Sequence, residues 1–276
     1  MRSHHFLQTF GNGLFGRWAL FAIAFAMACA TSANTAETSY GQIELLRGSV
    51  SILDAKGQAR TPKVDDKIFV GETIVTGRNG ELQVRTDDNG FVAFRANTRM
   101  KVEAYAAEGD KDDNMVVSLI YGTLRSVTGW IGKHNPGNYT IRTPAATIGI
   151  RGTDHEPHVV LPAGPGEAPP SVPPGTYEKV NSGATVIKNE GGQTIVGPNQ
   201  AGFAAHDGKA APRSLERIPD IYKPGANESR IENRGKELAK ELEEKRAARQ
   251  KEVAERKAKE EAHKKIEKHR HKPADK

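Results

Sequence analysis

The feature that most constrains the fold is a succession of short apolar runs and turns between residues 40 and 160. The runs are rich in β-branched and aromatic residues, and turn sequences such as Asn79-Gly80 and Asn89-Gly90 separate them. No part of this region keeps the 3.6-residue period of a helix. The expected strands are 43–46, 50–53, 68–75, 82–85, 92–94, 100–105 and 116–127. The sequence therefore predicts an all-β body.

A loose internal repetition leaves two architectures open. An apolar residue followed three positions later by glycine, and then by a further apolar residue, recurs in three places, at 45–50, 119–124 and 180–186. Such self-similarity is typical of a solenoid-like stack of β turns. The alternative is a twisted β-roll or sandwich of short strands, because three inexact copies do not fix a period.

Beyond the first strands, composition divides the chain further. We expect a β domain at 34–160 and a proline-rich loop at 161–175. Additional strands of the same body follow at 176–205 and a polar linker at 206–227. The additional strands are assigned to the same body because about 30 residues bury too little surface to fold alone.

Residues 228–272 are expected to form a single charged helix. Glu residues precede Lys or Arg by four positions repeatedly, as at Glu232/Lys236 and Glu241/Lys245. The large apolar residues do not keep a heptad pattern, which argues against a coiled coil; they are Ile231, Leu238, Leu242, Val253 and Ile266. We therefore expect a lone helix that stands away from the body.

The first 33 residues have the pattern of a signal peptide. Arg2 and Arg17 precede an apolar run at 18–30, which is too short to span a bilayer comfortably. We expect an N-terminal signal helix, cleavage near Ala33, and export to a bacterial periplasm or beyond. Cys29 is the only cysteine. A lipoprotein anchored through Cys29 is the alternative, and otherwise the mature chain has no thiol.

The net charge of +6 is unevenly distributed. Residues 228–276 carry +5 and residues 1–33 carry +2, so residues 34–227 carry −1. The basic pI therefore belongs to the ends of the chain. A nucleic-acid partner is not expected, because the β body has no excess of positive charge.

The stretch 141–154, IRTPAATIGIRGTD, has the character of a structural motif. Pro144 lacks a backbone donor, so a strand must begin after it or lie at an edge. The guanidinium of Arg151 could bind backbone carbonyls or a carboxylate at the strand end. The motif residues are Thr143, Pro144, Gly149, Arg151, Gly152 and Thr153. We interpret the two glycines as positions of close backbone approach or bending.

Together with upstream blocks, this motif resembles the FecR domain family over roughly residues 40–160. The further blocks are 45–52, 71–77, 89–90, 97–102 and 119–124, and they contain the glycines Gly48, Gly71 and Gly122. The resemblance implies a periplasmic signalling or interaction module. Family members with a cytoplasmic N-terminal domain resemble sigma-factor regulators. Only about 17 residues precede the apolar run here, so we expect a stand-alone exported member without the anti-sigma domain.

Two groups of polar residues are candidate ligand sites. Asp154, His155, Glu156 and His158 have side chains that can bind zinc or copper, but Pro157 limits the convergence of the two histidines, which favours the alternative of a solvated strand end. The acidic residues of 110–114 could bind calcium, but the glycine and glutamate of an EF-hand loop are missing. A hairpin tip is the alternative for this segment.

The sequence contains no recognisable catalytic constellation, so we expect neither an enzyme nor a cofactor. Two functional hypotheses remain. The first is a periplasmic FecR-type binding or signalling module whose β body contacts an envelope protein or polymer. The second is a structural envelope protein whose helical tail spans the periplasm or binds an anionic envelope component. Neither hypothesis includes a membrane span in the mature form.

Overall fold

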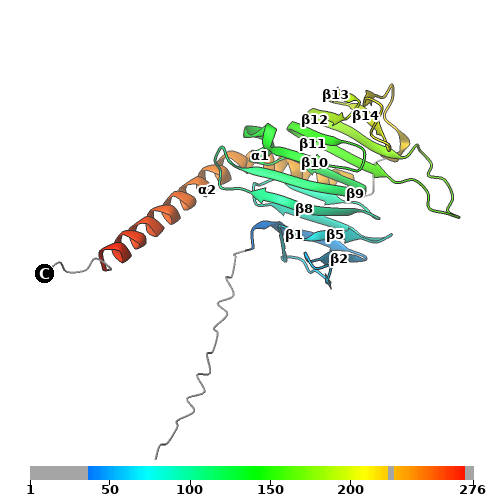
Figure 1. Ribbon diagram of the computed structural model, residues 1–276. Helices are drawn as coiled ribbons and strands as arrows, with labels where there is room; N and C mark the ends of the chain where they lie inside the picture. Colours follow the sequence, from blue (N-terminus) through cyan, green and yellow to red (C-terminus); the bar gives the residue numbers. More distant parts are fainter. Residues whose placement is uncertain (1–36, 223–226, 271–276) are drawn as a thin grey trace, which may run out of the picture. The chain divides into compact units, whose positions relative to one another are not determined.

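The computed structural model describes residues 37–222 and 227–270, with side chains up to residue 266. The predicted signal peptide and Cys29 lie outside the described residues. Figure 1 shows a β body followed by one long C-terminal helix, which confirms the predicted fold class. The strands are β1 (Ser39–Arg47), β2 (Val50–Leu53), β3 (Ala59–Arg60), β4 (Lys67–Phe69), β5 (Thr73–Thr76), β6 (Glu81–Thr86), β7 (Phe91–Phe94), β8 (Arg99–Ala106), β9 (Asn114–Val127), β10 (Tyr139–Arg142), β11 (Thr147–Val160), β12 (Gly175–Asn189), β13 (Gly192–Val196), β14 (Gln200–Ala205) and β15 (Arg213–Ser214). The α-helices are α1 (Trp130–His134) and α2 (Glu228–Arg270), and two short 3₁₀ segments are η1 (Pro136–Asn138) and η2 (Asp220–Tyr222).

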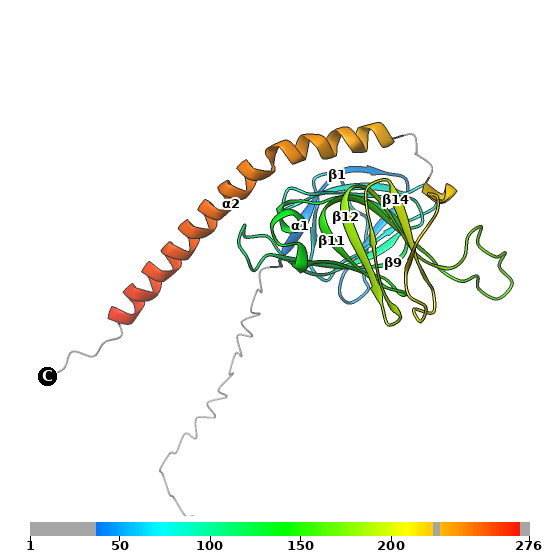
Figure 2. The ribbon, with the colours of Figure 1, turned by 90° about the horizontal axis from the view of Figure 1, so that it is seen from above.

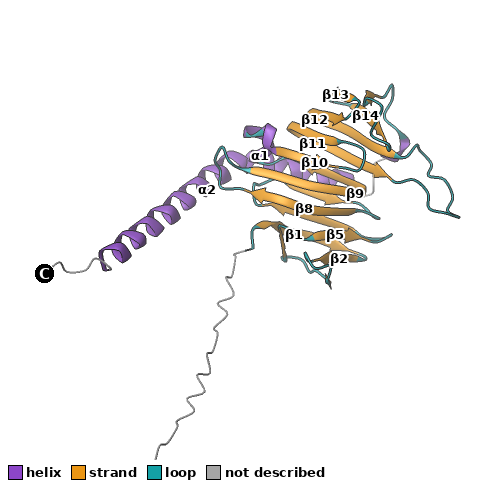
Figure 3. Ribbon diagram, in the orientation of Figure 1, coloured by secondary structure: helices purple, strands orange, loops and turns teal. Residues whose placement is uncertain are grey.

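Strand β9 organises the sheet, because it pairs with four other strands. Its N-terminal part pairs with β8 and β10, and its C-terminal part pairs with β7 and β11. From β7 the sheet continues through β6 and β1 to β4, and from β8 it continues through β5 to β2. On the other side, β11 leads through β12 to β14 and β15 (Figure 3). All three branches therefore meet at one long strand.

The main hydrophobic core involves both branches that lead away from β9 toward the N-terminus. It combines Ile43 of β1 and Leu82 of β6 with Ile52 of β2 and Ile74 of β5, all fully buried. Apolar residues of β9, β10 and β11 complete this core. Burial on alternate positions of these strands accounts for the apolar alternation in the sequence.

This arrangement corresponds to the twisted-roll or sandwich alternative. Among the described strand pairs only β9–β10 is parallel, and the others are antiparallel. A solenoid would instead stack successive turns through parallel pairs. The repeated apolar-to-glycine step marks bends in the chain: Gly122 and Gly183 lie inside β9 and β12, Gly48 lies between β1 and β2, and all three have positive φ.

Two local predictions differ from the structure. The single strand expected at 68–75 is two strands, β4 and β5, because the chain turns at Gly71, whose φ is +91°. The segment after β9 forms the short helix α1, in which Trp130 is buried and donates from Nε1 to Asp113 at 2.8 Å. Strand β12 pairs with β11, and β13 and β14 both pair with β12, so these strands continue the same sheet.

The expectation that α2 stands away from the body is wrong for its first 29 residues. Ile231, Leu238, Leu242 and Val253 are each 5% exposed or less, whereas Ile266 is 61% exposed. Figure 2 shows α2 passing beside the strands and bending partway along its length. The large apolar residues of α2 up to and including Val253 are therefore buried side chains. No helix within the described part of the chain is long and apolar enough to cross a membrane.

Candidate binding site

Charged side chains gather on the face of β7, β9, β11 and β12 that meets the start of α2. On β11 and β12 they occupy alternate positions, 154 and 156 on β11 and 179 and 181 on β12, since every second residue of a strand points to the same face. We call this cluster the ion network, and it consists of Arg95, Arg125, Asp154, Glu156, Lys179, Asn181 and Glu228. Arg95 directly follows β7, and Glu228 is the first residue of α2.

Arg125 is the most buried cation of the ion network, with 5% of its surface exposed. Its Nε donates to Asp154 Oδ1 at 2.9 Å and its terminal nitrogen to Asp154 Oδ2 at 2.6 Å, which is a bidentate pair. The other terminal nitrogen donates to Glu228 Oε1 at 2.5 Å. One guanidinium therefore joins β9, β11 and α2.

The second half of the ion network is centred on Glu156, which is 1% exposed. It accepts from Lys179 Nζ at 2.7 Å and from Arg95 at 2.9 Å. The same nitrogen of Arg95 also donates to Glu228 at 2.9 Å. Asn181 links the two halves, because its amide donates to Asp154 at 3.0 Å and to Glu156 at 3.2 Å. Three cations thus face three carboxylates.

These pairings keep Glu156 and Glu228 ionised. Burial alone would raise the pKa of Glu156, but hydrogen bonds and charge from Lys179 and Arg95 hold it below its ordinary value. Glu228 behaves in the same way, since Arg95 and Arg125 lower its pKa against the effect of burial. Positive and negative charges are matched within the ion network, so it presents no excess of one sign of charge.

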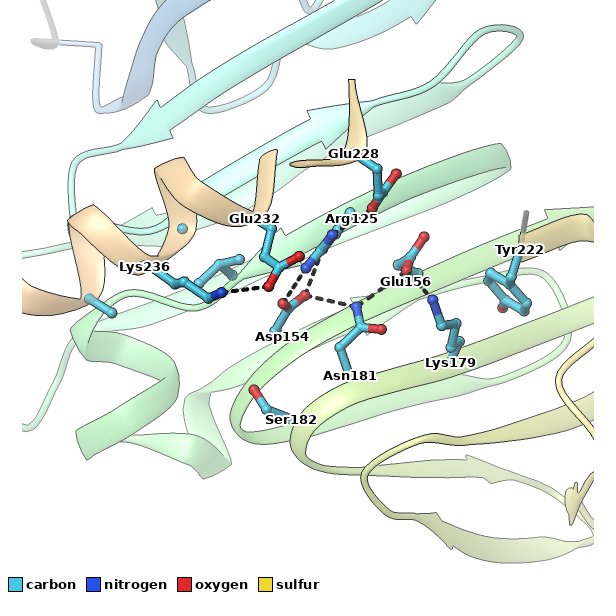
Figure 4. A pocket seen from close by; sticks show the side chains of 13 residues that line it. Arg125, Asp154, Glu156, Lys179, Asn181, Ser182, Tyr222, Glu228, Glu232 and Lys236 are labelled. Carbon is cyan, nitrogen blue, oxygen red and sulfur yellow. Dashed lines mark hydrogen bonds and ion pairs between the residues drawn. The ribbon is translucent and has the colours of Figure 1, made fainter. Parts of the chain in front are cut away.

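A cavity of about 500 Å³ lies between the ion network and α2 (Figure 4). The network side chains Arg125, Asp154, Glu156 and Lys179 line the sheet side, and Gly235 is among the α2 residues on the other side. This volume falls in the range of small-molecule pockets.

The structure separates the four predicted metal-site residues. Asp154 and Glu156 belong to the ion network, and His158 accompanies them on that face, where its Nδ1 lies 2.5 Å from Thr123 Oγ1. His155 pairs instead with Glu178, at 2.7 Å between Nδ1 and Oε1. In the described residues no group of three or more His, Cys, Asp or Glu side chains is placed to hold a metal ion.

His155 and Glu178 form a pair with no solvent exposure. Burial raises the pKa of Glu178, while His155 opposes that rise. His155 Nε2 and Glu178 Oε2 have no hydrogen-bond partner among the residues that the structure describes. Because both side chains are fully buried, the pair has no direct access to a ligand in solvent.

Burial also affects His158. It lowers the pKa of this imidazole to about 4, and the charge of Arg95 adds to the effect. The ring lies edge-on to Tyr177 and Tyr222, with centroid distances of 6.4 and 6.2 Å. His158 is therefore neutral at pH 7 and titrates only in acid.

The threonines of the 141–154 motif form hydrogen bonds that close loops. Thr143 Oγ1 donates to the Ala146 carbonyl at 2.7 Å, and Thr153 Oγ1 donates to the Ala184 carbonyl at 3.2 Å. Pro144 stands in the turn before β11, which begins at Thr147. Each threonine thus stabilises the geometry at one end of the motif.

The glycines of the FecR-like blocks differ in their surroundings. A Cβ at Gly122 would lie 2.4 Å from the carbonyl oxygen of Asn97, and its φ is +91°, so close approach and backbone conformation both favour glycine there. Gly48 is similar, with 2.0 Å to the carbonyl oxygen of Asn79. A Cβ at Gly149 would meet nothing within 4 Å, and Gly152 is open but has a φ of +57°.

Arg151 is exposed, and the hydrogen bond found for it within the described residues is from its backbone N–H to Thr153 Oγ1 at 3.3 Å. The arginine that binds a carboxylate of β11 is Arg125, through Asp154 in the middle of the strand, and the sequence analysis did not single it out. Its partners Asp154 and Glu228 are 29 and 103 residues away, so no local pattern indicates the contact. Gly235 is the one residue in the sequence of α2 that could have indicated its contact with the sheet, because glycine is unfavourable inside a helix unless close packing requires it.

The acidic segment 110–114 forms the tip of the β8–β9 hairpin. Asp113 is fully buried and accepts from the backbone N–H groups of Glu108 and Gly109 at 2.7 and 2.8 Å, as well as from Trp130. Its carboxylate oxygens are therefore used in holding the tip together.

Comparison with known proteins gives one family match. Residues 72–161 match the family model described as "FecR protein". The match includes the motif 141–154 and begins after the block at 45–52. No curated protein sequence matches this chain.

Among solved structures, two crystal structures of a candidate anti-sigma factor from Parabacteroides distasonis have TM-scores of 0.39, with 13% and 16% sequence identity. They cover 52% of this chain, which spans 59% of the length of that protein. A structure named "Cell surface anchoring domain" has 34% identity over 22% of this chain and 82% of that chain, with a TM-score of 0.22.

Proposed function

Because the chain carries a FecR domain over residues 72–161, we propose that it is a non-catalytic binding or signalling module of the bacterial envelope. In this proposal the chain is exported, its leader is removed, and the β body contacts an envelope protein or polymer. The resemblance to the FecR family supports the type of module. The identity of the partner depends on what the surface of the β body can bind.

The observation that carries the proposal is the saturation of the charged groups at the ion network. Glu156 and Glu228 are held ionised by Arg95, and Arg125 is shared between Asp154 and Glu228. General acid–base catalysis favours a group whose pKa lies near the working pH, and these carboxylates are shifted away from it. Saturated pairs serve instead to fix the relative positions of β9, β11 and α2.

A second candidate is a structural envelope protein that uses the helical tail. It is favoured by the exposure of the α2 side chains from Lys257 to Ile266, beyond the ion pair of Arg256 with Glu108 at 2.7 Å. A charged helix presented in this way could bind an anionic envelope polymer.

The two candidates are separated by truncation of the tail after Arg256. This cut keeps the part of α2 that covers Phe91 and Ala93, so the body stays intact. The full chain and the truncated chain, each with an affinity tag, are produced in a Gram-negative host. Envelope partners are captured at 0.05 and 0.5 M salt after photo-crosslinking.

If the β body carries the partner site, both proteins capture the same partner at both salt concentrations. Loss of capture on truncation, together with salt sensitivity of the full chain, would favour the tail. Retention of the full chain in the cytoplasm with residues 1–33 intact would refute export. Replacement of Cys29 by Ser in the same fractionation tests the lipoprotein alternative.

A further inference from the structure

The first four turns of α2 carry a narrow contact stripe. Ile231, Gly235, Leu238 and Leu242 follow one another at intervals of four, three and four residues, which places them on one face of a helix. Ile231 and Leu238 pack against Phe91 and other residues of β7 and β9. Ile231 and Leu238 are therefore seated on the outer face of the sheet, opposite the main core, whereas Leu242 packs with residues of the main core itself.

Gly235 marks the point of closest approach. A Cβ at this position would lie 2.8 Å from Val127 Cγ2 and 3.5 Å from Val127 Cβ. Any larger residue would push the helix away from β9. A partner helix on this face accordingly needs a small residue at the same place.

Polar contacts fix the direction of the helix on the sheet. Glu228 in the first turn reaches Arg95 and Arg125, and Arg234 forms a bidentate pair with Glu44, with Nε to Oε2 at 2.9 Å. In addition, the amide of Asn89 donates to the main-chain carbonyl of Leu238 at 2.9 Å. The last contact recognises a helix backbone and requires no particular side chain.

Two grooves open to solvent flank the start of α2. The pocket of about 500 Å³ lies on one side of the helix, and a second pocket of about 270 Å³, lined by Asn227, Glu228 and Ile231 with residues of β6 and β7, lies on another. The edges of this contact are therefore accessible to solvent, unlike the main core.

We propose that the face of β6, β7 and β9 beneath α2 is a helix-binding groove, in which α2 is the resident intramolecular ligand. A partner protein displaces α2 with an amphipathic helix of the same chemistry: apolar residues at i, i+7 and i+11, a small residue at i+4, and a carboxylate at i−3. The inference rests on the proposed function as a binding module, and it assigns the binding surface.

The probe is a fluorescent peptide of residues 227–256, which is the resident helix supplied in trans. A control peptide carries Leu238→Asp, because a carboxylate cannot be buried against Phe91 without a large cost. Binding is measured by fluorescence anisotropy against full-length protein in which Cys29 is replaced by Ser.

Variants of the full chain determine whether α2 occupies the groove or is released from it. Val127→Cys with Gly235→Cys places two Cβ atoms about 3.5 Å apart, which suits a disulfide, so oxidation holds α2 in place. Gly235→Leu introduces a side chain that collides with Val127 and releases α2 without shortening the chain. Glu228→Gln with Arg234→Met is a second releasing variant, for use if Gly235→Leu does not fold.

We expect the peptide to bind the released variant at least about tenfold more tightly than the wild type. It should not bind the oxidised disulfide variant, and reduction should restore binding to that protein. The control peptide should not bind any of them. Undiminished binding to the oxidised form, or no binding to a folded released variant, would overturn the groove. A failed capture of envelope partners would bear on the proposed function alone, because the peptide experiment contains no envelope component.

Discussion

Arg125 joins three elements through side-chain contacts that lie far apart in sequence. Its guanidinium is nearly buried, and it makes three hydrogen bonds to Asp154 and Glu228. A buried ion pair is costly to break, because the remaining partner is left as an unpaired charge in a poorly solvated place. A single substitution in the ion network should therefore lower the free energy of unfolding more than a substitution in a solvent-exposed ion pair does.

Replacement of Arg125 by Met should lower the free energy of unfolding by about 3 kcal/mol, because Asp154 and Glu228 lose a shared cation. Chemical denaturation followed by circular dichroism measures this change. Arg47→Met is the matched control. Arg47 is 54% exposed and lies 3.9 Å from Glu81, so its loss should cost less than about 0.5 kcal/mol. Equal effects of the two substitutions would contradict the role of Arg125.

His158 should make stability depend on pH. Its pKa of about 4 in the folded protein is below the ordinary 6.5, so the unfolded chain binds more protons between these values. The contribution to stability is complete above pH 6.5 and is lost as pH falls toward 4. His158→Asn removes the titration, so wild type should lose about 3 kcal/mol relative to the variant between pH 7 and pH 4. A stability difference between the two proteins that stays constant with pH would rule this out.

Among the elements, α2 depends most on contacts outside itself. Its sequence is dominated by charged residues, and an isolated helix of this kind gains only a few tenths of a kcal/mol from each i,i+4 pair. The contacts of Ile231, Leu238 and Leu242 with the body provide the stabilisation that helix propensity alone does not give. The helix should accordingly be sensitive along one face only.

Leu238→Ala should destabilise the protein by about 2–3 kcal/mol, since it removes a side chain that is 2% exposed. Ile266→Ala makes the same kind of change at a position that is 61% exposed, and it should cost less than about 0.5 kcal/mol. Thermal unfolding of both variants checks the difference. If Leu238→Ala were as mild as Ile266→Ala, the helix would not be seated as described.

The strands show where sequence reasoning succeeds at this scale. Turn pairs such as Asn89-Gly90 separate apolar runs, and local chemistry is enough to place them. The run 68–75 was read as one strand because its apolar residues hide the turn at Gly71.

The contact stripe of α2 was missed because only large apolar residues were considered, whereas Gly235 completes its spacing. The ion network joins partners that are 23 to 133 residues apart, which no local pattern contains.

At the scale of the whole molecule, α2 divides into a packed part and an exposed part. The contacts of Arg249 with Ala107 and of Arg256 with Glu108 bring the helix to the β8–β9 hairpin, and the side chains from Lys257 to Ile266 are exposed. The residues of α2 that stabilise the protein are thus different from the residues at 257–266 that are exposed.

Truncation after Arg256 should change the melting temperature by less than about 2 °C, because it removes no buried side chain among the described residues. Truncation before Glu228 should lower it by more than about 5 °C, because it uncovers Phe91 and leaves Arg125 without Glu228. Differential scanning calorimetry of the two truncated proteins and the full chain makes the comparison. Similar melting temperatures for both truncations would show that α2 adds nothing to the body.

The position of Glu228 also sets an order of events during synthesis. Ribosomes make a chain from its N-terminus, so β7 and β9 can pair before the residues of α2 have been translated. During that interval Phe91 and Ala93 are bare on the nascent sheet, and such apolar surface is the kind that chaperones hold and that aggregates when left unprotected. Completion of the fold therefore waits for a segment that is translated about a hundred residues after Arg125.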